Sequence, residues 1–351
     1  MINLLRDFWY VAMPSQMLKP GQVSGKKLLG EPIVVGRHQN GDVFALRDIC
    51  PHRGIPLHHG WVEDGGLRCC YHGWKFDTKD GQCAEIPSLV DADALDLTRI
   101  CVQAYPCQDV QGHIWVYVPG ASQSGNGRMP ASLPPVPIIR GFGDLKPNVT
   151  ETLRFDCDID QAVIGLMDPA HGPYVHTAWW WRSGPHKFRV KKKQYEPTPL
   201  GFRLSPYVMP DSAKPYKLLG SKVSIEIVFE LPGLRTELLE GNRYQACAFT
   251  AITPIDEGHC EVHQSLYWTF PDFGLARPLG RYMIRQFLGQ DRDVVIKQQE
   301  GLAYNPAMML IDDADTQAKW YYRLKREYVQ AQQENRAFQN PIEPTVLRWR
   351  S

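Results

Sequence analysis

The stretch CPHRGIPLHHGWVEDGGLRCCYHGWKFDTKDGQC, residues Cys50–Cys83, contains a Cys-x-His pair, Cys50 and His52, and a Cys-x2-His pair, Cys69 and His72. Each pair is short enough to lie on one tight loop, so each loop can present two ligands to a metal centre. Thiolates together with imidazoles are typical of zinc or iron–sulfur sites. Zinc ribbons usually carry Cys-x2-Cys pairs or a helix with two histidines, and neither pattern is present here. The spacing therefore favours a two-iron cluster over zinc, with the cysteines on one iron and the histidines on the other.

The segments around this stretch predict a small antiparallel β domain. Short alternating runs such as PIVVGRHQ, DVFALRD and GHIWVYV fill residues 28–118. Gln39–Asp42 contains Asn-Gly, a strong hairpin signal because a type I′ turn needs positive φ at both central residues. Residues 120–138 are rich in Gly, Ser and Pro and have no apolar period, which predicts a linker. We therefore divide the chain into a domain at 1–119, a linker at 120–138 and a second domain at 139–351.

The second domain mixes helical and strand signals. Residues 158–171 have a helical pattern, and residues 187–270 hold β-branched and aromatic runs such as VSIEIVFEL, which predict the strands of a larger sheet. Residues 275–300 and 312–337 predict helices with charged faces. The predicted fold class is therefore α+β, a small antiparallel β domain followed by a larger domain whose antiparallel sheet is flanked by helices.

The composition is that of an ordinary globular protein. Of 351 residues, 39 are Lys or Arg and 38 are Asp or Glu, which gives a net charge of +1. This balance argues against a broad basic surface for nucleic acid or for a membrane. No run approaches the ~18 apolar residues of a membrane-spanning helix. The first residues lack a basic segment and include Asp7, so we expect no secretory signal. Nine cysteines, an odd number, predict reduced thiols or metal ligands in a cytoplasmic protein.

A second candidate metal site lies in DPAHGPYVH, which begins at Asp168. If residues 158–167 are helical, Pro169 marks where the helix bends or stops. Asp168 and His171 lie three residues apart on one face, and a Gly-Pro turn can fold His176 back toward His171. Two histidines and one further anionic ligand would form a 2-His-1-carboxylate triad, which leaves positions on Fe(II) open for O2 and substrate.

Together these motifs resemble the Rieske non-haem iron oxygenases over nearly the whole chain. The sequences CPHRGIPLHHG and CCYHGWKFDTKDGQC resemble a Rieske [2Fe–2S] domain over about residues 5–118, and Asp-x2-His-x4-His resembles the family's mononuclear iron site. The resemblance implies that Cys50, His52, Cys69 and His72 hold the cluster. The length and the Leu-Met-Asp-Pro-Ala-His context are most similar to single-subunit oxygenases, namely the pheophorbide-oxygenase-like and demethylating monooxygenase groups.

The third ligand of the mononuclear iron must come from elsewhere in the chain. Asp293 lies four residues before Lys297, which is typical of a solvated ion pair. Asp291 shares a face with Val295 and two glutamines, a partly apolar stripe that can point inward. The run GQDRDVVIKQQEGL also resembles the family's C-terminal ligand helix. We therefore select Asp291, with Asp293 and the pair Asp312–Asp313 as alternatives.

The resemblance gives Asp168 a role other than that of a ligand. In the family, this aspartate hydrogen-bonds the first iron-ligating histidine, here His171, and reaches a cluster histidine, matching His72, of the neighbouring subunit. It implies a ring-shaped homotrimer in which electrons cross a subunit boundary, and a carboxylate between two imidazoles would orient both rings. Many relatives carry Asn or Glu one turn earlier, where this chain has Ile164–Gly165. Either that polar group is missing or Gln161 replaces it.

The function implied by the resemblance is that of a terminal oxygenase. It would activate O2 at Fe(II) with electrons from the cluster and would hydroxylate or oxidatively demethylate a hydrophobic, ring-containing substrate. The sequence has no Gly-x-Gly-x-x-Gly after a strand and no plant-type ferredoxin motif, so we expect a separate NAD(P)H-dependent reductase, with or without a ferredoxin. The alternatives are a ring-dihydroxylating dioxygenase and a non-catalytic Rieske electron-transfer protein, and the second metal site opposes the latter.

Other residues give weaker signals. Tyr174, the run Trp179–Trp181 and the segment Met209–Leu219 suit a pocket for a bulky sterol-like or terpenoid ring system, but core packing or surface lids explain them equally well. Cys70 is out of register for a ligand, and His58 with its neighbour is expected to be a loop histidine. The remaining cysteines are expected to be small buried hydrophobes: Cys83, Cys101, Cys107, Cys157, Cys247 and Cys260.

Overall fold

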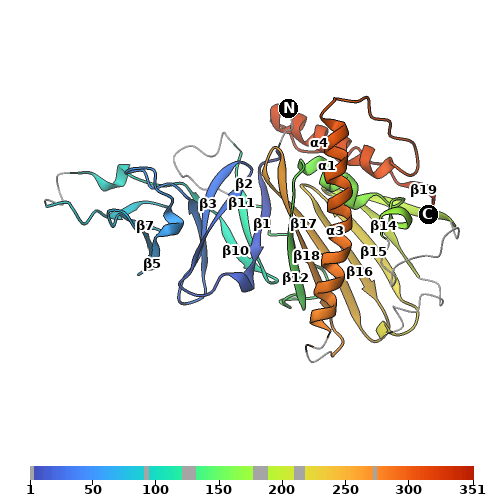
Figure 1. Ribbon diagram of the computed structural model, residues 1–351, viewed down its shortest axis with the longest axis horizontal. Coiled ribbons are helices and arrows are strands. Elements are labelled where there is room, and N and C mark those ends of the chain that lie inside the picture. The colour runs from blue at the N-terminus through green and yellow to red at the C-terminus, as the bar shows by residue number, and fades with distance from the viewer. Residues whose placement is uncertain are drawn as a thin grey trace. The chain divides into compact units, whose positions relative to one another are not determined.

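The computed structural model describes residues 4–90, 95–120, 132–176, 189–208, 218–271, 274 and 276–351 (Figure 1). The chain divides into two compact units. The N-terminal unit consists of Arg6–Leu145 with Thr253–Asp256, and the C-terminal unit consists of Met1–Leu5, Lys146–Ile252 and Glu257–Ser351. Most of the expected linker, residues 121–131, lies outside the described residues. No helix in the described part of the chain is long and apolar enough to cross a membrane.

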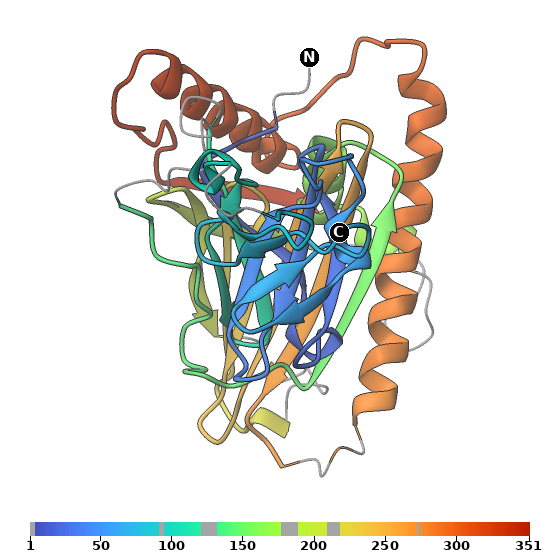
Figure 2. The same cartoon turned by 90° about the vertical axis from the view of Figure 1, so that its left-hand side faces the viewer.

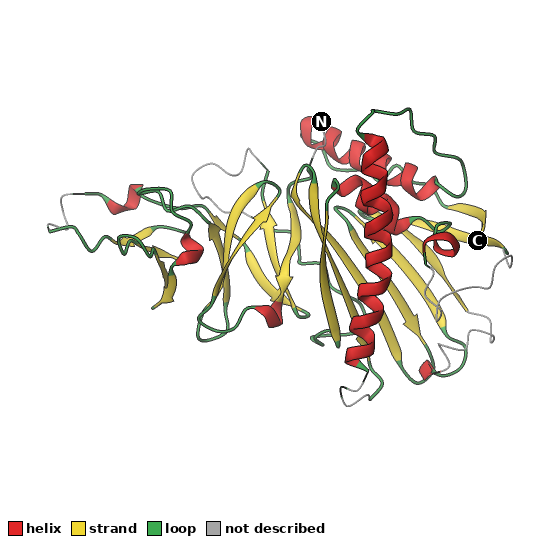
Figure 3. Cartoon of the chain, in the orientation of Figure 1, coloured by secondary structure: helices red, strands yellow, loops and turns green. Residues whose placement is uncertain are grey.

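The N-terminal unit is built from three small antiparallel sheets, as expected (Figure 3). The predicted hairpin is confirmed, because β3 pairs antiparallel with β4, but its turn is not the expected type I′: Gly41 has a φ of 100°, whereas the φ of Asn40 is not positive. Only glycine adopts such a φ without steric cost. The sheets contain β1 (Phe8–Pro14), β11 (His113–Val118) and β10 (Cys107–Val110); β2 (Val23–Leu28), β3 (Glu31–Arg37), β4 (Val43–Arg47) and β9 (Ala104–Tyr105); and β5 (Trp61–Glu63), β6 (Gly66–Arg68), β7 (Lys75–Asp77) and β8 (Cys83–Glu85).

Within the described residues, the C-terminal unit has an eight-stranded antiparallel sheet and four α-helices. The strand order is β12-β18-β17-β16-β15-β14-β13-β19, so the last strand of the chain forms one edge. The strands are β12 (Val149–Phe155), β13 (Val190–Thr198), β14 (Gly201–Val208), β15 (Ser224–Glu230), β16 (Leu234–Glu240), β17 (Gln245–Asp256), β18 (His259–Trp268) and β19 (Thr345–Arg350), and the helices are α1 (Ile159–Met167), α2 (Gly172–Val175), α3 (Arg277–Leu302) and α4 (Thr316–Gln333).

Helices α1 and α4 pack on the same face of this sheet. A Cβ built on Gly233, just before β16, would lie 3.3 Å from the side chain of Val163 in α1. Trp320 of α4 packs edge-on against Phe202 of β14, with ring centroids 5.1 Å apart. Side chains directly opposite each other on paired strands point to the same side of a sheet. The strand register therefore places Gly233 and Phe202 on one side, which we call the helix-covered face.

Helix α3 runs beside β12 and covers the same face at the other edge of the sheet (Figures 1 and 2). A Cβ built on Gly280 would lie 3.1 Å from Val149, so this glycine lets the helix approach the strand closely. One turn further on, Nε of Arg285 donates to Glu151 at 2.8 Å. The candidate metal ligands of this unit are on α3 and on the segment after α1.

The cysteine expectations are met in part. Cys83, Cys157, Cys247 and Cys260 are buried, but Cys101 is exposed and Cys107 is half-buried. Cys101 forms an isolated antiparallel bridge opposite Gln82, and its side chain is exposed. The expectation that it is a buried hydrophobe is therefore wrong.

Two candidate metal centres

The first candidate centre is formed by two loops with the same backbone geometry. The N–H of Cys50 and the N–H of Cys69 each donate to the carbonyl five residues later, at 2.9 Å in both loops. The carbonyls of these cysteines accept from the N–H groups of Gly54 and Gly73, at 2.8 and 3.1 Å. Both glycines have a φ of 73°, a conformation that other residues rarely adopt. Two equivalent tight turns therefore present the two Cys/His pairs.

The side chains of these loops form a thiol pair and an imidazole pair. Cys50 and Cys69 are buried and hydrogen-bonded to each other, and burial raises the pKa of Cys50 to about 11. The rings of His52 and His72 lie 4.4 Å apart, and the His52 ring stacks on Trp74. A sulfur pair beside an imidazole pair is the donor set of a two-iron cluster with His ligands on one iron.

The Nδ1 atom of His52 supplies an independent test of this fit. It is buried, and no other described group of the protein hydrogen-bonds it. A buried ring nitrogen without a partner costs about 1–3 kcal/mol unless something binds it. Coordination to iron would remove that cost, so the residues fit a cluster.

The neighbouring residues behave as loop residues. Cys70 is exposed, whereas the ligand candidate beside it in the sequence is buried. His58 pairs through Nδ1 with the carboxylate of Asp48, which also accepts from the His58 N–H at 2.8 Å. This aspartate fixes the loop that follows the first Cys/His pair.

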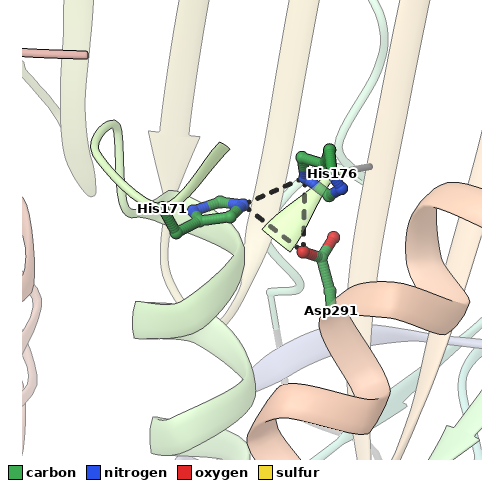
Figure 4. Close-up of side chains that lie close together, drawn as sticks. All are labelled: His171, His176 and Asp291. Carbon is green, nitrogen blue, oxygen red and sulfur yellow. Dashed lines mark hydrogen bonds and ion pairs between the residues drawn. The ribbon is translucent and has the colours of Figure 1, made fainter. Parts of the chain in front are cut away.

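The second candidate centre brings together His171, His176 and Asp291, as Figure 4 shows. The two Nε2 atoms are 3.1 Å apart, and Oδ1 of Asp291 lies 3.3 Å from Nε2 of His171 and 3.4 Å from Nε2 of His176. In the described part of the chain, these are the residues whose three ligand atoms all fall within 4.8 Å of one another. One ion could therefore contact all three.

The Nδ1 atom of each histidine ring already forms a hydrogen bond within the protein. Nδ1 of His171 donates to the main-chain carbonyl of Asp168 at 2.8 Å, and Nδ1 of His176 donates to Oε1 of Gln290 at 3.2 Å. A ring that donates from Nδ1 keeps the lone pair of Nε2 for a metal. Both lone pairs therefore point toward Asp291, which is the arrangement that an iron ligand set requires.

The local sequence explains how the segment after α1 folds back. Helix α1 ends at Met167, as the following Asp-Pro predicted, because proline disfavours helix in the residue before it. The short helix α2 then begins at Gly172, has its proline in the first turn and ends at Val175, so that His176 caps its C-terminus. This one turn brings the second histidine toward the first. The ring of His176 also stacks on Phe287 of α3, with centroids 3.6 Å apart.

The three acidic alternatives do not approach the two histidines. Asp291 is 5% exposed and faces them from the middle of α3. Asp293 is on the outer side of the helix and pairs with Arg292 at 2.9 Å. Asp312 is exposed and pairs with Lys319 at 2.6 Å, and Asp313 caps the N–H of Arg348 at 2.9 Å.

The pKa shifts of the two histidines are also compatible with a metal site. Burial acts to lower the pKa of His171, but the carboxylate of Asp291 outweighs it and the pKa is raised. Burial lowers the pKa of His176, so one ring of the pair is held neutral. A cation bound between the rings and the carboxylate would satisfy all three groups at once.

Asp168 is near His171 but contacts it differently from the expectation. Its carboxylate accepts from the N–H of Ala170 at 2.7 Å and lies 3.8 Å from the Nδ1 of His171, while its main-chain carbonyl takes that hydrogen bond. Burial raises the pKa of Asp168, and the neighbouring Asp315 adds to this rise. Because the Ala170 N–H binds Oδ1, Oδ2 keeps capacity to accept a hydrogen bond from a further donor.

Helix α1 shows why glycine occurs at position 165. A Cβ there would lie 3.1 Å from Val295 of α3, so a larger residue would push apart the two helices that carry the site. Gln161 is buried, and its Oε1 has no hydrogen-bond partner among the described groups.

Phe287 and Gln290, which contact His176, were not expected from the sequence. Phe287 lies one helical turn before Asp291, and Gln290 lies immediately before it. This spacing on the helix is the signal that could have identified them.

Part of the expected pocket lies outside the described residues, namely the run Trp179–Trp181 and residues 209–217. Tyr174 is 73% exposed and Leu219 is buried, so the described ends of these segments do not share one environment.

Comparisons with known proteins find one domain family and several similar oxygenases. The Rieske [2Fe-2S] domain family model matches residues 8–106. The 4beta-methylsterol monooxygenase of Methylococcus capsulatus is 27% identical over 87% of this chain and 83% of its own length. The oxygenase component of dicamba O-demethylase from Stenotrophomonas maltophilia is 32% identical over 50% of this chain and 49% of its own.

Solved structures share the fold over nearly the full chain. The dicamba monooxygenase structure bound to dicamba has a TM-score of 0.66 at 23% identity and covers 95% of this chain and 98% of its own. The QL mutant of NdmA from Pseudomonas putida CBB5 with caffeine has a TM-score of 0.73 at 20% identity and covers 97% and 96%. Residues 8–106 therefore belong to the Rieske [2Fe-2S] domain family, and the chain as a whole is similar in sequence and fold to Rieske non-haem iron oxygenases, oxidoreductases that use a [2Fe–2S] cluster and a mononuclear iron.

Proposed function

We propose that Cys50, His52, Cys69 and His72 hold the [2Fe–2S] cluster and that His171, His176 and Asp291 hold the iron. The assignment of the iron ligands rests on the convergence of the two Nε2 lone pairs on the buried carboxylate of Asp291. When bound, the iron supplies open coordination positions at which O2 is activated. The protein's own residues orient the two rings through Asp168 and Gln290 and pack the site against Phe287.

The chain acts as a terminal monooxygenase in this proposal, and its substrate is a hydrophobic ring compound. The relatives reported above are a methylsterol monooxygenase and an O-demethylase, both of which act on ring-containing molecules by name. Hydroxylation and oxidative demethylation begin with the same reaction. When an O- or N-methyl group is hydroxylated, the resulting hydroxymethyl group leaves as formaldehyde. Ring dihydroxylation is the alternative outcome.

Electrons come from a separate NAD(P)H-dependent reductase, directly or through a ferredoxin, in this proposal. The chain assembles as a homotrimer, and Asp168 accepts a hydrogen bond from His72 of the neighbouring subunit. The support is the Asp168 carboxylate, which binds the Ala170 N–H and keeps acceptor capacity, together with the accessible position of His72. The expected cytoplasmic location stays a prediction.

The test is turnover with isotopically labelled O2 and an artificial reductant, on protein reconstituted with iron and sulfide. One labelled oxygen atom in a hydroxylated product, or release of formaldehyde together with a demethylated product, supports monooxygenation. Two labelled oxygen atoms in the ring product support the dioxygenase alternative, and reduction without O2 uptake on any ring substrate supports an electron carrier.

The trimer is tested separately by co-assembly of two inactive variants, Cys69→Ser and Asp291→Ala. Partial activity in mixed rings is expected, because some intact clusters then lie beside intact irons of the other chain. Mixed rings that stay inactive, or an active monomer, would rule out the cross-subunit route.

A further inference from the structure

Arg235 and Glu237 form an ion pair on the helix-covered face of the sheet. They follow Gly233 at intervals of two residues along β16, so all three project to the same side. Gly233 faces Val163 of α1, which identifies that side as the one the helices cover. The same helix leads into the candidate iron ligands after Met167.

Two further polar side chains lie beside this pair. Thr250 of β17 is directly opposite Arg235 in the strand register, and its hydroxyl donates to Oε1 of Gln264 on β18 at 2.6 Å. Because the hydroxyl occupies Oε1, the group that Gln264 can offer to a ligand is its amide N–H2. Gln264 is in turn opposite Glu151, which α3 covers through Arg285. A polar row therefore crosses the sheet from β16 toward the helix that carries Asp291.

The pair is not needed to hold the sheet together. The positions on either side of Glu237 on this face are apolar, with Ile227 directly opposite it on β15 and Ala248 opposite it on β17. The side chains of Arg235 and Glu237 are 26% and 28% exposed, so water reaches them although helices pack on the same face. An ion pair among apolar neighbours contributes little net stability, because desolvation offsets the attraction.

We propose that Arg235 and Glu237, with the amide of Gln264, form a polar anchor that binds a hydroxyl group of the substrate. The apolar frame of the substrate would lie along Ile227 and Ala248, with its reacting carbon directed to the iron ligands. The pair is neutral as a whole and offers N–H donors and a carboxylate acceptor together. A neutral hydroxyl, which donates and accepts, matches it better than a carboxylate, which would compete with Glu237 for the guanidinium. This inference rests on the proposed monooxygenase function and names its substrate class, ring alcohols.

The experiment measures binding to the iron-loaded protein by quenching of tryptophan fluorescence, without reductant. The probes are one-ring, two-ring and four-ring frames, the last a 4-methylsterol, each as the alcohol, the matching deoxy hydrocarbon and the matching carboxylate. In the unmodified protein, at least one frame is expected to bind about tenfold or more tightly as the alcohol than as the hydrocarbon. The double variant Arg235→Met/Glu237→Met keeps the volume and leaves no unpaired charge, so the preference should reverse toward the hydrocarbon.

A matched control is available on the opposite face of the same sheet. Arg203 pairs there with Glu196 and Glu226, at 2.9 and 3.5 Å. Arg203→Met removes a comparable ion pair and should leave the alcohol preference unchanged. A lost preference in this control, equal binding of alcohol and hydrocarbon for every frame, a carboxylate preference, or no binding of any frame would each overturn the anchor.

Because the binding assay uses no electrons, its result is independent of the oxygenase assay. Alcohol-selective binding without oxygen incorporation would refute the monooxygenase proposal and leave the anchor standing.

Discussion

The two metal centres differ in how far apart in the sequence their ligands lie. The cluster loops use two short motifs, each closed by its own glycine turn and hydrogen bonds. The iron site joins a compact motif, His171 and His176, to Asp291 on a helix more than a hundred residues later. The first centre depends mainly on local turns, whereas the second depends on α1 and α3 being packed in one register. Substitutions should therefore affect the two centres independently and by different routes.

The largest effect is expected at the cluster. Cys69→Ser should abolish the visible absorption of the cluster and with it all turnover, because a buried sulfur that pairs with Cys50 is lost. Its exposed neighbour provides the control, since Cys70→Ser should keep full colour. Absorption spectra with iron and sulfide analysis decide this, and a Cys69→Ser protein with two irons and two sulfides would refute the ligand assignment.

At the second centre, Asp291→Ala should lose the mononuclear iron and reduce turnover by at least about a hundredfold, with an unchanged cluster spectrum. The carboxylate is the only anionic group within 3.5 Å of both Nε2 atoms in the described part of the chain. Asp293→Ala, two residues away and exposed on the same helix, should keep its iron and most activity. If Asp291→Ala retained turnover and Asp293→Ala lost it, Asp293 rather than Asp291 would be the iron ligand.

The contrast between the centres also explains what could be predicted from the sequence. The pairing of Cys50 with Cys69 and of His52 with His72 was predictable, because residues that are adjacent in a tight loop leave their pattern in the sequence itself. The choice of Asp291 needed the apolar stripe of a whole helix, and the structure brings that residue to the histidines. Phe287 and Gln290 contact His176 only through the packing of α3, which no local pattern encodes.

Other differences have the same cause. The hairpin at Gly41 follows from backbone conformation and was predicted, whereas the edge strand β19 was not. That strand, Thr345–Arg350, has Val346, Arg348 and Arg350 exposed on one side and acquires its conformation by pairing with β13. The expectation for Asp168 was incomplete because its main chain, rather than its carboxylate, holds the nearby imidazole.

A smaller effect is expected where the two centres are proposed to communicate. Asp168→Asn keeps the main-chain carbonyl that orients His171 and changes only the carboxylate. The variant should retain both metals and the assembled state and lose most, though not all, turnover, because an amide is a poorer acceptor for an imidazole N–H. Metal analysis, sizing and single-turnover reduction of the iron site measure this. Unchanged turnover would show that the carboxylate does not link the centres.

The smallest effect tests the helix packing on which only the second centre depends. Gly165→Leu should destabilise the protein by about 1–3 kcal/mol, since the added side chain would overlap Val295 of α3. It should also weaken iron retention by shifting Asp291, while the cluster spectrum stays unchanged. Gly289→Ala is the matched control, because nothing lies within 4 Å of a Cβ at that helical position. It should raise stability by up to about 1 kcal/mol and leave both metals in place. Thermal unfolding with parallel iron analysis separates the two outcomes, and a Gly165→Leu protein with full iron content would show that the register of α1 and α3 does not control the site.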